Sequence, residues 1–262
     1  MLMSWLKEKR RHKILEQPFP RQWGEYIVSN VAHWAFLDAA ERDYLQDLVQ
    51  VFVAEKTWEP CGVPHLTAEI QVTIAAQACL LLLGFDHDLY RNVKSILVYP
   101  STVVAPDHVD PDTFHVLGVH RSAVPILGQA VAHGPVILVW DAVAMNARHP
   151  ERGHNVVYHE FAHKIDMLDG TVDGTPPLAD HAEFARWVVV CTREFELVRK
   201  KGAQGRRTLL GAYAGTNPAE CFADATEVFF DKPTKMKETH PDLYDVLHLF
   251  YKQDPSAREQ HF

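Results

Sequence analysis

The chain has 262 residues, of which 47% are hydrophobic and 23% charged, and its formal net charge is −8. These values are typical of a folded protein that buries a sizeable core, in one large domain or two small ones. The acidic balance argues against a direct nucleic-acid-binding protein. Phosphate contacts need a concentrated basic face, and we find none beyond the first dozen residues. An acidic enzyme fits the composition better.

The sequence shows no obvious targeting signal. Met1 to Lys13 is basic, but no apolar run of signal-peptide length follows it, so we expect no secretory signal. The longest apolar segment, Ile70 to Phe85, contains polar residues and is too short to span a bilayer comfortably. The four cysteines lack CxxC spacing, which favours reduced thiols. We therefore expect a cytoplasmic protein without a membrane span.

The N-terminal half is expected to be largely helical. Residues 1–17 predict a basic helix or tail in solvent, with an amphipathic membrane anchor as the alternative. From about Asp38 to Val53, apolar residues recur at helical spacing among charged neighbours, which predicts a helix with one buried stripe. Thr67 is a suitable N-cap for a second, strongly apolar helix that Gly84 ends.

A small sheet is expected in the middle of the chain, with helices after it. Three segments rich in β-branched and aromatic side chains predict strands: residues 93–99, 113–120 and 136–140. Three later segments predict helices: residues 181–200, 218–230 and 235–252, each approximately. The order of helices, sheet and helices implies an α+β fold.

No internal repeat or linker divides the chain, so we expect one domain over residues 1–262. Within it, residues 18–130 form a helical and sheet part. Residues 131–252 supply an active-site strand and the later helices.

The segment His159-Glu160-Phe161-Ala162-His163 has the HExxH pattern. In a helix, His159 and His163 lie one turn apart on the same face, so two imidazoles can converge on one metal ion. Glu160 projects beside them and is a candidate general base for a water molecule on that ion. A peptidase site of this kind needs a third protein ligand from elsewhere in the chain.

The best candidate for the third ligand is Glu220. Asn217 suits the N-cap and Pro218 the first helical position, which places Glu220 in the first turn of a helix. The alternative is structural, because Asn217 and Glu220 also have the spacing of a capping box. Taken alone, that alternative is the stronger interpretation.

The two motifs together carry a more specific resemblance. HEFAHKID at His159 to Asp166, followed by YAGTNPAECFAD at Tyr213 to Asp224, resembles the gluzincin-type zinc peptidases related to the catalytic domain of anthrax lethal factor. Within that group the sequence is most similar to the bacterial Mlc titration factor A (MtfA) family, over most of the chain. The resemblance implies a predominantly helical, zincin-like fold with a small mixed sheet beside the HExxH helix.

The resemblance also implies roles for individual residues. His159, His163 and Glu220 would bind one Zn²⁺ ion, Glu160 would be the general base, and Tyr213 would donate a hydrogen bond to the oxyanion. For each of two further acidic residues, two roles are possible. Asp224 either supports a ligand histidine or is an exposed helix carboxylate. Asp166 either orients a ligand or caps the following loop, and we favour the structural role.

Some nearby residues are expected to lie outside the metal centre. Cys221 is adjacent to Glu220, but neighbouring helical residues point in different directions. His149 and His154 lack an i, i+4 partner in the motif and are expected at the surface.

For function, the resemblance implies an aminopeptidase-like zinc peptidase that acts on peptide or protein substrates. It also implies binding of the transcriptional repressor Mlc, which would regulate the glucose phosphotransferase system. The alternative is a non-catalytic protein that titrates the repressor and whose zinc site is structural or regulatory. A peptide substrate could pair with an exposed strand edge, for which Gly134 to Trp140 is our candidate, although its apolar run fits a covered strand nearly as well.

Overall fold

The computed structural model describes residues 2–62, 65–85, 87–101, 103–104, 125–126, 128–130 and 134–259. Its α-helices are α1 (Leu2–Leu15), α2 (Arg21–Asn30), α3 (Ala39–Glu55), α4 (Ala68–Leu80), α6 (Trp140–Arg148), α7 (Val156–Asp166), α8 (His181–Ala203), α9 (Pro218–Asp231), α10 (Pro233–Thr239), α11 (Pro241–Tyr251) and α12 (Pro255–Glu259). Its 3₁₀ helices are η1 (Ala32–Phe36), η2 (His87–Tyr90), η4 (Pro150–Arg152), η5 (Met167–Asp169) and η6 (Tyr213–Gly215). Its strands are β1 (Thr57–Pro60), β2 (Ser95–Tyr99), β3 (Val103–Val104), β4 (Pro125–Ile126), β5 (Gly128–Ala130) and β6 (Val136–Val139).

Four of these strands form one mixed sheet in the order β1-β2-β6-β5. The strands β1, β2 and β6 are parallel, and β5 runs antiparallel to β6 with Ala130 opposite Val136. The strands β3 and β4 form a separate antiparallel pair. The predicted strands at 93–99 and 136–140 are confirmed as β2 and β6, whereas the one expected at 113–120 lies outside the described residues.

Our candidate for an exposed strand edge was wrong. The strand β6 pairs with β2 on one side and with β5 on the other, so its backbone groups are already hydrogen-bonded within the sheet. Its apolar run is buried except for the half-buried Ile137, as is typical of a central strand. Within the described part of the sheet, β5 is the edge strand next to the HExxH helix.

Two helices of the N-terminal half, α3 and α4, begin where the sequence predicts, whereas α2 was not predicted. The side chain of Asp38 accepts a hydrogen bond from the Glu41 N–H, and the Glu41 side chain accepts one from the Asp38 N–H, so a capping box starts α3. Thr67 caps α4. The basic N-terminus is a helix, α1, and its Arg11 pairs with Glu55 on α3 at 2.8 Å. None of the described helices has the length and apolar character that crossing a bilayer requires.

The helix predicted over 235–252 is two helices. His240 has φ −138° and ψ 57°, which ends α10, and Pro241 begins α11. The cause is local, because a proline ring clashes with the preceding turn, while proline fits well at the first position of a new helix.

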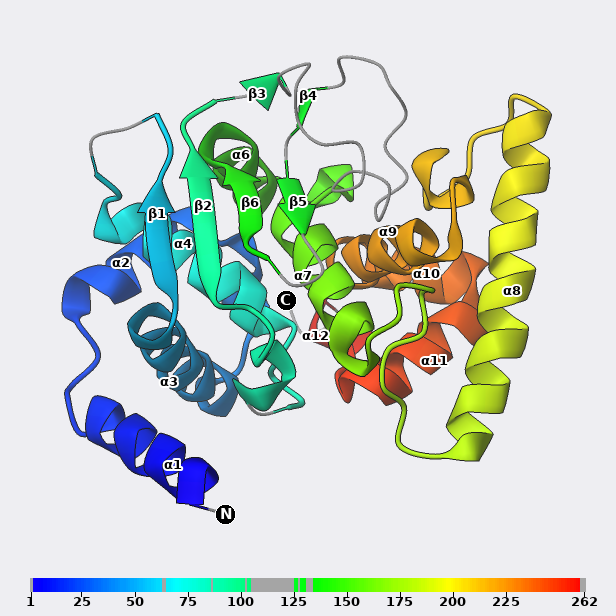
Figure 1. The fold of residues 1–262 in the computed structure, drawn as a ribbon. Coiled ribbons are helices and arrows are strands. Elements are labelled where there is room, and N and C mark those ends of the chain that lie inside the picture. The colour runs from blue at the N-terminus through cyan, green and yellow to red at the C-terminus, as the bar shows by residue number, and fades with distance from the viewer. Residues whose placement is uncertain are drawn as a thin grey trace.

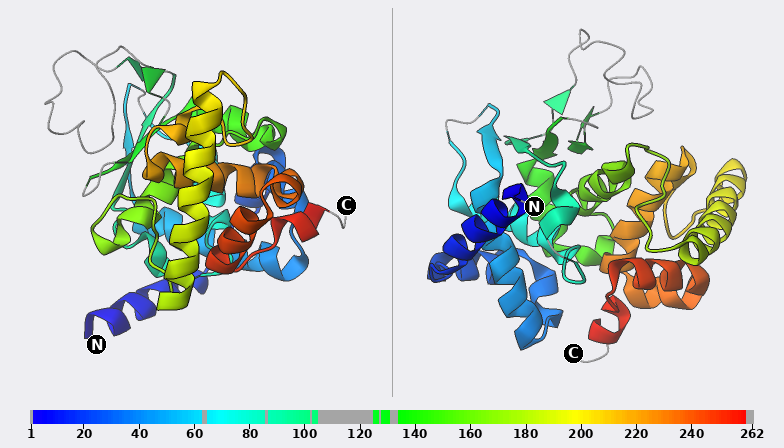
Figure 2. Two further views of the ribbon diagram at one scale, coloured as in Figure 1. Left: turned by 90° about the vertical axis from the view of Figure 1, so that its right-hand side faces the viewer. Right: turned by 60° about the horizontal axis from the view of Figure 1, so that its bottom comes forward.

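The helix α7 lies between the sheet and the C-terminal helices (Figures 1 and 2). Phe161 on α7 is fully buried, and its ring contacts those of Tyr90 at 4.8 Å and Phe52 at 5.7 Å between centroids. On its other side α7 packs along α9. The predicted α+β fold, mostly helical with a small mixed sheet beside the HExxH helix, is confirmed.

Candidate metal centre

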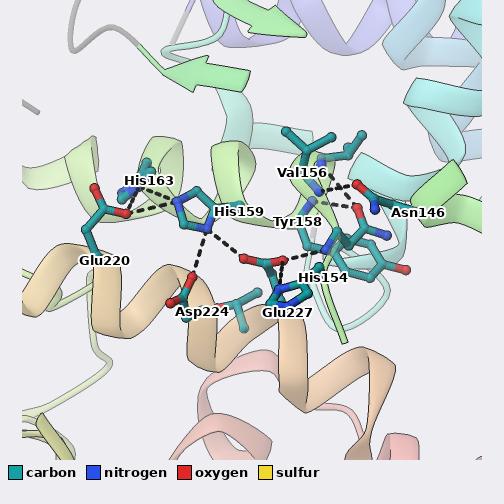
Figure 3. A network of polar contacts seen from close by, with 12 residues as sticks. Asn146, His154, Val156, Tyr158, His159, His163, Glu220, Asp224 and Glu227 are labelled. Atoms are coloured by element: carbon teal, nitrogen blue, oxygen red, sulfur yellow. Dashed lines mark hydrogen bonds and ion pairs between the residues drawn. The ribbon is translucent and has the colours of Figure 1, made fainter. Parts of the chain in front are cut away.

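The two histidines of the HExxH motif converge as their spacing predicts. Asn155 caps α7 by accepting hydrogen bonds from the backbone N–H groups of Val157 and Tyr158, which sets where the helix begins. One turn apart, His159 and His163 point their Nε2 atoms at each other across 3.2 Å (Figure 3).

The carboxylate of Glu220 completes this cluster from α9. Asn217 caps the helix by accepting a hydrogen bond from the Glu220 N–H at 2.9 Å, as predicted. The side chain of Glu220 does not return to the cap. Its Oε2 lies 2.9 Å from His159 Nε2 and 3.3 Å from His163 Nε2. These contacts favour the interpretation of Glu220 as a ligand candidate over the capping box.

The donor set fits a divalent metal. Tetrahedral coordination with bonds of about 2.0–2.1 Å places neighbouring ligand atoms roughly 3.3 Å apart. The three atoms here are separated by 2.9, 3.2 and 3.3 Å. Three electron-rich atoms facing one point repel unless a cation or a shared proton lies between them. Two imidazole nitrogens and one carboxylate are also a donor set that Zn²⁺ prefers.

The other nitrogen of His159 faces two carboxylates on α9. Its Nδ1 lies 2.7 Å from Glu227 Oε1 and 3.3 Å from Asp224 Oδ1 (Figure 3). Glu227 also accepts a hydrogen bond from the backbone N–H of Asn155. An Nδ1–H donated to Glu227 leaves the Nε2 lone pair directed at the metal position.

Glu227 is a site residue that our sequence analysis missed, because we considered only Asp224 for this role. The signal was present, since Glu227 is seven residues after Glu220 and therefore lies on the same face of the helix. Burial raises the pKa of the Glu227 carboxyl. Burial alone would lower the pKa of His159, but hydrogen bonds to Asp224, Glu220 and Glu227 raise it well above its ordinary value.

Glu160 lies beside the histidines and against the edge strand. It is 5% exposed, and burial raises its pKa above the ordinary value although the two histidines oppose the shift. The backbone N–H of Ala130 on β5 donates a hydrogen bond to its carboxylate. Gly128 on the same strand leaves no room for a side chain, because a Cβ there would lie 2.7 Å from Glu160 Oε1. The strand and the carboxylate thus hold each other in place.

Lys164 follows one turn after Glu160 and is fully buried. Its Nζ donates a hydrogen bond to the carbonyl oxygen of Gly134 at 2.9 Å. This contact ties α7 to the residues just before β6, the partner of the edge strand.

Tyr213, on η6, lies near the ring of His159. Its side chain is about half exposed, and its ring lies 6.1 Å from the ring of His159 between centroids. Partial burial and the negative charge of Glu220 raise the pKa of the Tyr213 hydroxyl. The hydroxyl therefore stays protonated at neutral pH and can donate a hydrogen bond.

The remaining predicted residues have separate environments. Asp166 is fully buried, and its Oδ2 accepts a hydrogen bond from the Gly174 N–H at 2.9 Å, within the loop that follows α7. Cys221 is a free thiol outside the groups of possible metal ligands among the described residues. His149 is exposed, as is His154, whose Nδ1 lies 4.0 Å from Glu227 Oε2.

Comparisons with known proteins agree with this geometry. The model of the family "Glucose-regulated metallo-peptidase M90" matches residues 5–252. The chain belongs to the M90 metallopeptidase family.

The chain is also similar to individual proteins over most of its length. An uncharacterized protein of Synechocystis is 32% identical over 252 residues, which are 96% of this chain and 90% of that protein. A protein named Mlc titration factor A from Serratia proteamaculans is 32% identical over 86% of this chain and 84% of its own length. Its namesake from Klebsiella pneumoniae is 31% identical over the same shares. The predicted resemblance to the MtfA family is confirmed.

Proposed function

We propose that this protein is a zinc-dependent peptidase with aminopeptidase-like activity. The observation that carries the proposal is the convergence of His159 Nε2, His163 Nε2 and Glu220 Oε2 on one position, with the buried carboxylate of Glu160 beside it. When bound there, a zinc ion supplies Lewis acidity toward a peptide carbonyl and lowers the pKa of water. Membership of the M90 family supports this chemistry.

Each side chain around the metal position has a separate role in the proposed hydrolysis. Glu160 accepts the proton of the attacking water and then passes it to the leaving amine, as general base and general acid. Burial raises the pKa of the Glu160 carboxyl, so this carboxylate accepts a proton from water more readily than an ordinary glutamate does. Tyr213 donates a hydrogen bond to the carbonyl oxygen as negative charge develops there. Glu227 orients His159.

The substrate is proposed to bind as an extended peptide along β5. Peptides that add to a sheet edge gain register from backbone hydrogen bonds, independent of their side chains. The strand β5 is antiparallel to its partner β6 and borders α7 at Gly128 and Ala130. A scissile bond paired with this strand would pass beside Glu160.

The test compares the wild type with Glu160→Gln and Glu220→Ala. We expect one zinc ion per wild-type chain and hydrolysis of short chromogenic peptides. The Glu160→Gln variant should keep its zinc and lose at least 100-fold in kcat, because only proton transfer is removed. The Glu220→Ala variant should lose zinc. Unchanged hydrolysis in Glu160→Gln would refute the mechanism, and slow cleavage of N-blocked peptides relative to free ones would support the aminopeptidase assignment.

A second proposed function is binding of the transcriptional repressor Mlc. The observation that favours it is the similarity to proteins named Mlc titration factor A over most of their length. Purified Mlc should be retained by the immobilised protein. Retention by Glu160→Gln would show that the interaction does not depend on turnover, whereas no retention by either form would refute this function.

A further inference from the structure

A concentrated basic surface lies at the C-terminal end of α8 and just after it, contrary to our expectation that no such surface exists beyond the first dozen residues. Residues 197–219 contain five of the 26 basic residues and none of the 34 acidic ones. We call these five residues the basic rim: Arg199, Lys200, Lys201, Arg206 and Arg207. They were overlooked because uncharged residues at 202–205 divide them in the sequence.

The basic rim is not neutralised within the described chain. Four of its residues are exposed and Lys201 is half-buried. None of the five forms an ion pair with a described carboxylate, and Arg199 only stacks on Phe195. Like charges gathered without partners repel one another, so this arrangement favours an anionic group from outside the chain.

Helix capping accounts for only part of this charge. Lys200 and Lys201 lie in the last turn of α8, where cations are stabilised by the helix dipole. Arg206 and Arg207 come after the helix, beyond a turn in which Gly205 has φ +67°. The Arg206 N–H donates a hydrogen bond to the Lys201 carbonyl oxygen at 2.9 Å, which joins this segment to the helix end. That contact uses backbone atoms and does not require a cationic side chain, and both arginine side chains are exposed.

The basic rim lies beside the metal centre. A Cβ on Gly215 would lie 3.5 Å from both Arg199 Cγ and Val198 Cγ1, so η6 rests directly on the end of α8. The same short helix carries Tyr213 and packs against α9. Figure 1 shows the C-terminal end of α8 rising next to η6, on the side of the molecule that also holds the start of α9.

The charges at the metal centre have the opposite sign. Glu160, Glu220, Asp224 and Glu227 all lie within the cluster around His159. These carboxylates and the net charge of −8 would repel an acidic peptide from the site. A cationic surface next to Tyr213 offsets that repulsion for a peptide whose acidic residues lie just beyond the scissile bond.

We propose that the basic rim is a specificity surface that binds acidic side chains of the peptide substrate. This inference rests on the proposed peptidase function. The peptide crosses the metal centre along β5, passes Tyr213 and places its carboxylates against Arg199, Arg206 and Arg207. The interaction is exposed, so it acts mainly on substrate binding and weakens as salt rises.

The test measures binding without turnover. The Glu160→Gln protein is titrated into a dye-labelled extended peptide with three glutamates and into its counterpart with three glutamines. We expect the acidic peptide to bind about tenfold more tightly at low salt. Adding Arg206→Glu and Arg207→Glu should abolish that preference and leave the glutamine peptide unaffected. The matched control is Lys9→Glu with Lys13→Glu on α1, which should change neither affinity.

Several outcomes would overturn the proposal. Equal binding of both peptides would do so, as would a preference that survives the reversal of Arg206 and Arg207. Tighter binding of a DNA duplex than of the acidic peptide would assign the surface to nucleic acid instead. Circular dichroism and zinc content must match the parent protein, and Arg206→Gln with Arg207→Gln provides a milder variant if charge reversal prevents folding.

Turnover separates this proposal from the peptidase function. In the wild type, kcat/KM should be higher for the acidic peptide through a lower KM, and the charge reversal should raise KM without changing kcat. If the wild type cleaves neither peptide, the peptidase proposal fails, while the binding preference of the Glu160→Gln protein still decides whether the basic rim recognises acidic chains.

Discussion

Both ring nitrogens of His159 have polar partners, and these contacts fix the orientation of the ring at the metal position. Nε2 faces Glu220 and His163, while Nδ1 faces Glu227 and Asp224. A carboxylate on Nδ1 fixes the tautomer and the orientation of the ring. Glu227 is nearer than Asp224, at 2.7 Å against 3.3 Å, and is further held by the Asn155 backbone.

Glu227→Gln should therefore weaken zinc binding more than Asp224→Asn does. We expect the Kd for zinc to rise about 10–100-fold for Glu227→Gln, because the neutral amide no longer increases the basicity of His159. The rise for Asp224→Asn should be several-fold smaller. Competition with a chelator of known affinity measures both. Equal losses, or a larger loss in Asp224→Asn, would contradict this assignment.

Gly128 has no space for a larger residue. Its Cβ would lie 2.4 Å from Val156 Cγ2 and 2.7 Å from Glu160 Oε1. Gly128→Ala should displace Glu160 and β5, and lower kcat/KM by at least tenfold while zinc content is kept, since small misplacements of a catalytic group are costly.

The control for Gly128→Ala is Gly24→Ala. Gly24 has nothing within 4 Å of the position of an added Cβ and lies inside α2, where alanine is favoured. This control should keep full activity. Full activity in Gly128→Ala as well would show that β5 does not position Glu160.

At the scale of elements, the site depends on how α7 and α9 face each other. The stripe formed by Glu220, Asp224 and Glu227 follows one face of α9, and the two histidines follow one face of α7. The loop after α7 helps to set this packing. The Asp166 carboxylate accepts a hydrogen bond from the Gly174 N–H. Gly174 in turn lies against the start of α9, since a Cβ there would lie 2.3 Å from the Pro218 carbonyl oxygen.

Asp166 should make stability depend on pH. Burial raises its pKa to about 6, against an ordinary value of 3.8. A raised pKa in the folded state means that stability is fully present below pH 4 and is lost as pH rises through 6, by about 3 kcal/mol at neutral pH. Asp166→Asn keeps an acceptor for the Gly174 N–H and removes this loss.

Urea unfolding of the metal-free proteins between pH 4 and 7 tests this prediction. The free energy of unfolding of Asp166→Asn, relative to the wild type, should increase by up to about 3 kcal/mol across that range. A difference that stays constant with pH would mean that Asp166 keeps its ordinary pKa in the folded protein.

At the scale of the whole molecule, the sheet side and the helical side share one buried core. Phe52 on α3, Phe161 on α7 and Tyr251 on α11 belong to the same cluster of buried residues. We therefore predict that the chain unfolds as one domain. Calorimetry of the metal-free protein should give one transition, with equal calorimetric and van't Hoff enthalpies.

Phe161→Ala tests the same prediction from inside the core. It should lower the free energy of unfolding by about 3–5 kcal/mol, because Phe161 is fully buried against Phe52 and Tyr90. The single transition should persist at a lower temperature. Two separate transitions in either protein would show that the N-terminal and C-terminal parts fold independently.

Local signals were enough to predict much of the fold and part of the site. Thr67 and Asn217 predicted two helix starts because capping depends only on neighbouring residues, and apolar periodicity placed the start of α3 near Asp38. The HExxH spacing placed His159 and His163 on one face for the same reason. The strand β5 was missed, since Gly-Gln-Ala has no strand propensity and its position depends on pairing with β6.

The sequence alone therefore determined the residue types of the candidate centre: two histidines one turn apart, a neighbouring glutamate and a further glutamate in the first turn of a later helix. Helical periodicity and capping are short-range effects, so they can be read from the chain itself. Only the tertiary structure decided that Glu227 supports His159, that β5 is the strand edge beside Glu160, and that the basic rim lies next to Tyr213. Each of these depends on contacts between segments far apart in sequence, which are set by how α7, α8 and α9 pack around a common core.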